Sequence, residues 1–465
     1  MNRLLSSRWL PLAAAAGLLL VLAAQFVKIR VPSRPVRGIE ALRELRDRDD
    51  LNVVFVLIDT LRADRLSAYG YGRPTSPTLV DLAHSGVRFA HVQAQSSWTK
   101  TSMASLWTGT YPGRNGVLRY PDAIPESRKL PAEILKEAGY ETFGLYRNGW
   151  VANNFGFAQG FDVYATPARR RQADVARANP SGGHLPGSDF DVSESAAEFL
   201  RAAGGRKTFV YLHYMDVHQY VFDDQSSLFG TTFSDSYDNA IHWVDRNVQH
   251  VLTGLDEAKL LARTVVVIAA DHGEAFSEHG IEGHGKQLYR EVVETPLLLV
   301  LPFRLDREVV VDEPVENVDV WPTLLDLLGL PALPDAQGRS LLPAIEAAYR
   351  NAPDLAAAER PRISQIDRTW GRIESPPDPL VKIARGDWRF YLGPASDPPQ
   401  IELYDAATDP GEQQNRAADE AETVAAFRAE AERYLADRPT EGRAEVREID
   451  EMRLQQLRAL GYVVR

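Results

Sequence analysis

Leu51-Asn52-Val53-Val54-Phe55-Val56-Leu57-Ile58 decides how this chain folds, and Asp59 follows it directly. The stretch is a nearly unbroken apolar run with high strand propensity, which is typical of a strand covered on both faces in a parallel sheet. Similar runs recur at 208–214, 264–270 and 296–301, with helical stretches between them. This alternation predicts an α/β fold with a doubly wound, mostly parallel sheet flanked by helices.

The helical stretches have recognisable ends and faces. The segments 130–138 and 320–328 are followed by Gly139 and Gly329, and glycine suits the left-handed position after a helix. Between 237 and 255 apolar residues recur at spacings of three and four, which predicts one buried face. These residues are Ile241, Val244, Val248, Val251 and Leu255.

The chain has 465 residues, whereas single domains usually stop growing at roughly 250 to 300 residues. We therefore expect a large domain over 51–345 and a smaller C-terminal α+β domain over 346–465. After about residue 345 the alternation of runs and helices fades, and 388–403 suggests short antiparallel strands followed by an acidic helix. The C-terminal domain would end in a helical tail.

The first 30 residues predict export from the cytoplasm. Residues 10–27 form an apolar run preceded by two arginines, the pattern of a signal anchor or a signal peptide. We favour the anchor, so that this segment would bind the membrane and the rest would be extracytoplasmic, either periplasmic or at the cell surface. The basic residues at 28, 30, 34 and 37 oppose export by the positive-inside rule. We interpret 31–50 as a polar linker.

Composition excludes several classes of function. The net charge of −12 disfavours nucleic acid and anionic membrane surfaces as partners, because those reward clusters of Lys and Arg. An anionic small substrate would need local positive charge or a bound metal. Cysteine is absent, which excludes disulfides, thiolate metal sites and thiol nucleophiles.

Polar residues gather just after the predicted strands. In a doubly wound sheet ligands collect beyond the carboxyl ends of the strands, and this is where Asp59, Asp216, His218, Asp271 and His272 stand. A carboxylate beside an imidazole, as in Asp271-His272, can bind one metal, although a surface turn would look the same. Five of the ten histidines fall near these strand ends, at 213, 218, 272, 279 and 284. This recurrence favours a metal site.

Thr99 begins a polar turn that leads into a short helical stretch closed by Gly109. A hydroxyl at a helix N-terminus lies where unpaired N–H groups and the dipole favour an anion, and a nearby divalent metal would make its alkoxide accessible. The alternative is that Thr99 is an ordinary helix cap, which is the commoner role of threonine at such a place.

Several motifs, in order along the chain, resemble those of the sulfatase family, which belongs to the alkaline-phosphatase superfamily. The resemblance covers nearly everything from Leu51 onward and implies that 51–345 is the catalytic domain. The motifs are 57–64, 69–71, 75–77, 104–112, Asp271-His272-Gly273-Glu274, His284-Gly285-Lys286, 294–297, 319–329, 338–341, 403–405, 409–410 and the terminal Leu460-Gly461-Tyr462.

The resemblance implies roles for individual residues. Asp59, Thr99, Asp271 and His272 fall where the family holds its divalent metal, which would be Ca, Mg, Mn or Zn, and Thr99 also falls where the family keeps its nucleophile. His218 resembles the histidine near the leaving group, a role that His284 could share, and Lys286 resembles the lysine that binds a substrate oxygen. We expect one metal ion. The alternative is a second, zinc-like site made by Asp216, His218 and His284.

The departures from the family pattern bear on the reaction. Sulfatases carry Cys or Ser in a Cys-x-Pro-x-Arg motif whose first residue becomes formylglycine, whereas this chain has Thr99, Thr101 and Met103 there. Thr60 stands where many members have a second acidic ligand. Threonine nucleophiles resemble those of phosphorus-transferring members of the superfamily, so we expect a phosphate or sulfate ester hydrolase that favours phosphate.

Two alternatives to this hydrolase stay open. One is a membrane-anchored transferase that moves a phospho head group. The other is a catalytically silent relative that binds sulfated or phosphorylated glycans, because Met103 replaces the arginine of the motif.

Overall fold

The computed structural model describes residues 34–168, 175–179, 185–352, 360–370, 375–437 and 444–447. The chain from Pro35 onward forms one compact unit. The predicted export segment 1–30 and the terminal Leu460-Gly461-Tyr462 motif lie outside the described residues. Within the described part of the chain, no helix is both long and apolar enough to cross a membrane.

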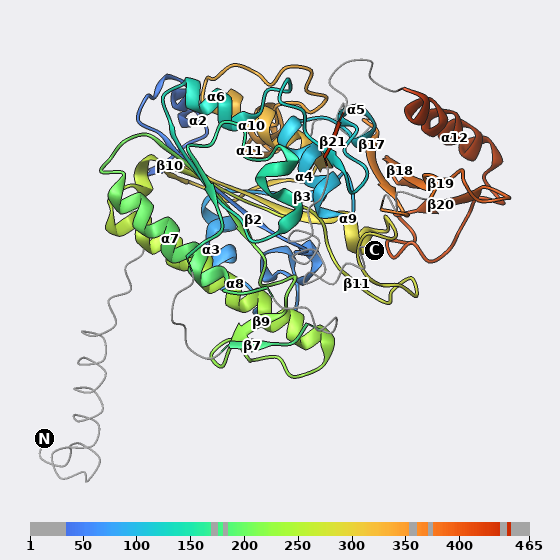
Figure 1. Cartoon of the computed structure of the whole chain (residues 1–465), viewed down its shortest axis with the longest axis horizontal. Coiled ribbons are helices and arrows are strands. Elements are labelled where there is room, and N and C mark those ends of the chain that lie inside the picture. Colours follow the sequence, from blue (N-terminus) through green and yellow to red (C-terminus); the bar gives the residue numbers. More distant parts are fainter. Residues whose placement is uncertain are drawn as a thin grey trace, which may run out of the picture. The chain divides into compact units, whose positions relative to one another are not determined.

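The centre of the unit is a nine-stranded sheet (Figure 1). The decisive run forms β2 (Asn52–Ile58), which pairs in parallel with β8 (Thr208–Tyr214) on one side and β10 (Thr264–Ala269) on the other. Beyond β8 lie β5 (Glu141–Leu145) and β6 (Val163–Ala165), also parallel. These pairings confirm the predicted doubly wound, mostly parallel sheet.

One strand runs against the others in this sheet. The apolar run at 296–301 belongs to β13 (Glu294–Val300), which is antiparallel to both β10 and β3 (Val87–Gln93). A strand buried on both faces reads as an apolar run in either direction, so the pattern could not reveal the reversal. The short strands β15 (Val309–Val311) and β16 (Val315–Glu316) pair with β3 at the edge.

Helices cover both faces of the sheet, as Figure 1 shows. On one face Val54, Val56 and Ile58 of β2 join the core formed with α3 (Pro77–Ser85), α7 (Asp189–Ala202) and α8 (Phe233–Glu257). On the other face Val53, Phe55 and Leu57 pack in a core with α4 (Thr99–Thr108), α6 (Pro131–Glu137), α10 (Val320–Leu327) and α11 (Leu342–Tyr349). The strand's alternate residues thus enter two cores, which explains its unbroken apolar run.

The predicted helix ends and faces agree with the structure. Gly139 and Gly329, just beyond α6 and α10, have φ angles of 85° and 65°, the left-handed region that only glycine adopts without strain. The apolar stripe of α8 is buried throughout: Ile241, Val244, Val248, Val251 and Leu255.

Part of the predicted linker is folded. Val36–Arg37 forms β1, which pairs with β14 (Arg304–Leu305), and Ala41–Glu44 forms α2. Ile39, Leu42 and Leu45 are buried in the core. Their spacing of three residues makes one short helical face, which the many charged residues around them obscure in the sequence.

The C-terminal part contains a small antiparallel sheet, as expected. Its order is β17 (Arg362–Asp367), β18 (Pro379–Arg385), β19 (Trp388–Gly393) and β20 (Gln400–Asp405), and α12 (Ala421–Ala436) packs on it. The domain boundary at 345/346 stays a prediction. Shorter elements are α5 (Pro112–Asn115), α9 (Arg290–Val293) and three two-stranded pairs, β4 (Asp122–Ala123) with β21 (Glu445–Val446), β7 (Val175–Arg177) with β9 (Val221–Asp223), and β11 (Ala275–Phe276) with β12 (Glu282–Gly283).

Candidate active site

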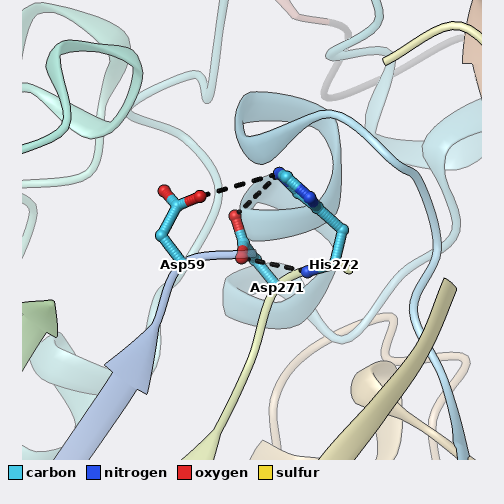
Figure 2. Close-up of side chains that lie close together, drawn as sticks. All are labelled: Asp59, Asp271 and His272. Carbon is cyan, nitrogen blue, oxygen red and sulfur yellow. Dashed lines mark hydrogen bonds and ion pairs between the residues drawn. The ribbon is translucent and has the colours of Figure 1, made fainter. Parts of the chain in front are cut away.

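The carboxyl ends of the central strands bring the predicted site residues together. Leu57 of β2 pairs with Ala269 of β10, so Asp59 and Asp271, each two residues further on, leave the sheet side by side. Thr99 is the first residue of α4, whose N-terminus lies over the same edge. Figure 2 shows Asp59, Asp271 and His272 directed toward one another.

These three side chains form a candidate metal centre. One ligand atom from each lies within 4.8 Å of the others, and none of the three is exposed to solvent. Asp59 Oδ1 and Asp271 Oδ2 are buried and have no hydrogen-bond partner. Burying unpaired carboxylate oxygens is costly unless a cation satisfies them. The donor set therefore fits the divalent metal that the family resemblance implies.

The hydrogen bonds of His272 prepare it as a ligand. Its Nδ1 donates to the carbonyl of Gly273 over 2.9 Å, which leaves a lone pair on Nε2. Nε2 lies 3.4 Å from Asp271 Oδ2 and 3.8 Å from Asp59 Oδ1. Asp271 Oδ1 accepts the backbone N–H groups of His272 and Thr60, so its other oxygen is the one turned to the site.

Without a cation, the carboxylates of Asp59 and Asp271 repel each other. Burial and the charge of Asp59 raise the pKa of Asp271 to about 7. Burial opposes ionisation of Asp59 as well, but the hydrogen bond from His213 and the nearby His218 and His272 hold the pKa of Asp59 below its usual value. A divalent cation would relieve the repulsion between the two carboxylates and favour ionisation of both.

Thr99 lies beside the candidate metal ligands. It is fully buried, and its Oγ1 lies 3.1 Å from His272 Nε2. The N–H groups of the first turn of α4 have no partner inside the helix, so they and the helix dipole favour negative charge at this point. Thr60, by contrast, donates its hydroxyl to the backbone carbonyl of Asp59.

Asn148 and His213 are two site residues that the sequence reasoning did not assign. Asn148 Oδ1 accepts the N–H of Trp150, so its Nδ2 faces Asp59 Oδ2 at 2.7 Å and Thr99 Oγ1 at 3.4 Å. His213 Nε2 donates to Asp59 Oδ2 over 3.0 Å. His213 had been noted among the clustered histidines, but an asparagine shortly after a strand has no distinguishing signal.

His218 and His284 form a second group beside the metal ligands. Their ring centres are 5.1 Å apart, and the ring centre of His284 is 4.6 Å from that of His272. His284 Nδ1 lies 3.1 Å from a carboxylate oxygen of Glu274. Burial raises the pKa of Glu274 to about 7 and lowers that of His284 to about 4. The imidazole is therefore neutral near pH 7.

The structure does not assemble the alternative second metal site. Asp216 is an ion-pair partner of Arg147 at 2.5 Å, and its other oxygen accepts hydrogen bonds from Trp243 Nε1 and from the backbone of Asp189. Among the residues that the structure describes, Asp59, Asp271 and His272 make the one group with metal-ligand geometry. His279, the remaining clustered histidine, stacks on Tyr289 away from this group.

Lys286 and Met103, two positions that the family pattern singles out, differ in exposure. Lys286 is exposed, and its ammonium contacts the carbonyl of Glu282 at 3.5 Å, although its charge acts on the neighbouring His284. Met103, where the motif of the family has arginine, is completely buried in the core.

Comparison with known proteins places the chain in a family. A model of the sulfatase family matches residues 51–330. Steryl-sulfatase of Mus musculus is 24% identical over 78% of this chain and 77% of its own length. N-acetylglucosamine-6-O-sulfatase of Bacteroides thetaiotaomicron is 20% identical over 78% of this chain and 82% of its own length.

Solved structures show the same fold. The phosphonate monoester hydrolase of Agrobacterium radiobacter superposes with a TM-score of 0.64 at 17% identity, over 86% of this chain and all of that one. The fold and the matched motifs agree, and the chain is an ester hydrolase that belongs to the sulfatase family.

Proposed function

We propose that this sulfatase-family hydrolase cleaves phosphate esters in preference to sulfate esters, through a covalent intermediate on Thr99. The observation that carries the proposal is the buried Thr99 hydroxyl at the N-terminus of α4, 3.1 Å from His272 Nε2, in a chain without cysteine. Threonine cannot be converted to formylglycine, so the hydroxyl itself must be the nucleophile.

The side chains divide the work of the first step. Thr99 Oγ1 attacks the phosphorus in line with the leaving-group oxygen, which takes a proton from His218 or His284 as it departs. Asn148 holds the direction of the Thr99 hydroxyl through its amide N–H, and Lys286 binds an equatorial oxygen. A divalent cation held by Asp59, Thr99, Asp271 and His272 would supply the positive charge that lowers the pKa of the hydroxyl and offsets charge on the ester.

The preference for phosphate follows from the second step. A formylglycine hydrate expels sulfate by collapsing to an aldehyde, but a threonine ester has no second hydroxyl and must be cleaved by attack at phosphorus or sulfur. Phosphorus accepts that attack more readily. A phosphorylated Thr99 should therefore turn over, whereas a sulfated Thr99 should accumulate and stall.

A panel of 4-nitrophenyl phosphate monoesters, phosphate diesters and sulfate esters, each with Ca²⁺, Mg²⁺, Mn²⁺ or Zn²⁺, tests the proposal. Steady turnover of a phosphate ester is expected, with single-turnover reaction at most for sulfate esters. Thr99→Val should abolish both, while Thr108→Val makes the same change at the other end of α4 and should stay active. The proposal fails if sulfate esters turn over faster than every phosphate ester, or if Thr99→Val keeps near-normal activity.

The same assays separate the alternatives. When an acceptor alcohol is added, a head-group transferase would form the phosphate ester of that alcohol and would release less inorganic phosphate. A silent glycan-binding relative would show no turnover and no dependence on metal.

The proposed extracytoplasmic location and membrane anchor are tested by the accessibility of a reporter fused after Arg37 in intact cells.

A further inference from the structure

The Asp409-Pro410 motif near the C-terminus supplies none of the candidate site residues, yet its loop is tightly built. Asp409 Oδ2 accepts the backbone N–H groups of Gln413 and Gln414, both over 2.7 Å. Within this loop Glu412 has a φ of 55°, the left-handed region that is strained for a residue with a side chain. Such a conformation persists only where the surroundings hold it, so the neighbours of Glu412 fix its position.

Both carboxylate oxygens of Glu412 have partners, although its side chain is only 2% exposed. Oε1 lies 3.0 Å from the ammonium of Lys382 on β18. Oε2 accepts the hydroxyl of Tyr391 over 2.8 Å and the backbone N–H of Arg290 over 2.9 Å. Burial raises the pKa of Glu412, but Lys382 and the other donors outweigh burial and hold the pKa below its usual value. The group is therefore a charged acceptor.

The contacts with Arg290 join the C-terminal motif to α9. Arg290 is the first residue of this short helix, so its N–H has no partner inside the helix, and Glu412 supplies the acceptor. Arg290 Nη1 also donates to the carbonyl of Pro410 over 2.8 Å. The two ring nitrogens of His279 face the carbonyl of Glu412 at 2.9 Å and Glu291 Oε1 at 2.8 Å. Backbone and side chains of the motif thus hold α9.

The segment 287–293, which contains α9, also contacts two turns of the active site. The carbonyl of Gln287 accepts the hydroxyl of Ser97 over 2.6 Å, in the turn that leads into α4. The carbonyl of Val292 accepts the N–H of Gly273 over 3.0 Å, directly after the candidate metal ligands. This segment therefore connects the C-terminal motif to the turn of the nucleophile and to the turn of the metal ligands.

We propose that Glu412 is a positioning residue, through which the C-terminal domain holds Thr99 and the metal ligands in their reactive arrangement. Removing its carboxylate leaves the N–H of Arg290 and the ammonium of Lys382 without their acceptor, so α9 shifts toward other partners. Because the segment 287–293 contacts both turns, its shift changes the position of Thr99 relative to the metal ligands. This role is the same for a phosphate and a sulfate ester, so it goes beyond the proposed function.

Two substitutions separate the acceptor from the bulk of the side chain. Glu412→Leu keeps the approximate volume and removes both acceptors, whereas Glu412→Gln keeps one acceptor oxygen. With the 4-nitrophenyl ester that the wild type hydrolyses best, Glu412→Leu should lower kcat about 100-fold, the loss expected when a distant change misplaces reacting groups by about 1 Å. KM should change little, and Glu412→Gln should recover part of kcat. If Glu412→Leu does not fold, Glu412→Gln takes its place and should still lie below the wild type.

Phe427→Ala is the control for a purely structural effect. Phe427 is buried in the hydrophobic core between α12 and the small sheet, where its ring stacks on Phe390 with centres 5.7 Å apart. Urea unfolding measures the stability lost in each variant, and kcat is compared at a temperature at which all of them are folded. Phe427→Ala should keep the wild-type kcat. The inference is overturned if it lowers kcat as much as Glu412→Leu does, or if Glu412→Leu keeps the wild-type kcat.

Amide hydrogen exchange tests the same link without catalysis. Glu412→Leu should speed exchange at the amides of Arg290 and Gly273, whereas Phe427→Ala should speed exchange in α12 and leave these two amides as in the wild type. Unchanged exchange at both amides in Glu412→Leu would overturn the inference, even if the activity falls. A wild type that hydrolyses no ester would contradict the proposed function alone, because the exchange measurement would still decide the role of Glu412.

Discussion

Arg147 Nη1 lies 2.5 Å from Oδ1 of Asp216, and both side chains are buried. The pair joins two loops of the site, because Asn148 follows Arg147 and His218 stands two residues after Asp216. Asp189 accepts from the same nitrogen at 2.7 Å and also from the backbone of Met215 and Asp216. One guanidinium thus pairs with two buried carboxylates, and burial together with the charge of Asp216 raises the pKa of Asp189 to about 7.

Arg147→Met should destabilise the protein by about 3–5 kcal/mol, because it removes one partner of a buried ion pair and leaves uncompensated charge. Urea unfolding measures the loss. Arg206→Met removes the partner of Glu141 in an exposed pair, with side chains 61% and 37% exposed, and should cost at most ~1 kcal/mol. Equal losses in the two variants would contradict the structural role of the buried pair.

Asp271→Asn should lower both metal content and hydrolysis, since it removes a carboxylate from a site that has only two. A cation that binds only the folded state stabilises it by about 2.7 kcal/mol when its free concentration is 100 times the Kd. Adding metal should therefore raise the Tm of the wild type but not of this variant. Asp245→Asn is the control, because Asp245 is buried elsewhere, beneath the first turn of α3. Unchanged metal stoichiometry in Asp271→Asn would refute the ligand assignment.

His279 should make stability depend on pH. Its two ring nitrogens face Glu291 Oε1 at 2.8 Å and the carbonyl of Glu412 at 2.9 Å. Burial lowers its pKa, but these two acceptors outweigh burial and raise the pKa above its usual value. A raised pKa stabilises the fold below the unfolded pKa of about 6.5 and loses that effect as pH rises through the folded pKa.

Unfolding of the wild type and His279→Gln at pH 6 and pH 9 checks this sign. The variant should be less stable than the wild type at pH 6, and the difference should shrink at pH 9. His91→Gln, at a surface position, should show no comparable change. A difference that grows toward pH 9 would reverse the interpretation.

Gly285→Ala should reduce turnover while metal binding is retained. Gly285 has a φ of 75°, and an added Cβ would lie 2.7 Å from the ring of Trp370, so the turn between His284 and Lys286 must shift. Gly280→Ala has the same kind of backbone, with a φ of 71°, but meets no atom within 4 Å. Both variants carry the strain of a left-handed alanine, roughly 1–2 kcal/mol. Steady-state rates should therefore fall only for Gly285→Ala.

The sequence sufficed for the central strands and for residues whose chemistry is distinctive. The apolar run 51–58 and the Asp271-His272 pair locate both the sheet and its functional edge without any tertiary information. The reversed direction of β13 could not be predicted, because an apolar run looks the same in a parallel and an antiparallel strand. The folded segment 36–47 was missed because its short buried face, Ile39, Leu42 and Leu45, lies among charged residues.

Hydrogen-bond roles could not be predicted at all. Asn148 belongs to no motif that distinguishes a site residue from a surface one, and its role depends on contacts with residues distant in the chain. The alternative second metal site is likewise not assembled among the described residues, since Asp216 pairs with Arg147, which no spacing in the sequence connects to it.

The buried Met103 has an evolutionary consequence. Restoring the arginine of the family motif by Met103→Arg alone would place an unpaired guanidinium in the core, at a cost of several kcal/mol in a fold whose total stability is about 5–15 kcal/mol. Changing Thr99 to cysteine first would leave it without that arginine. Neither substitution alone is therefore expected to give a working formylglycine enzyme, so both positions would have to change together.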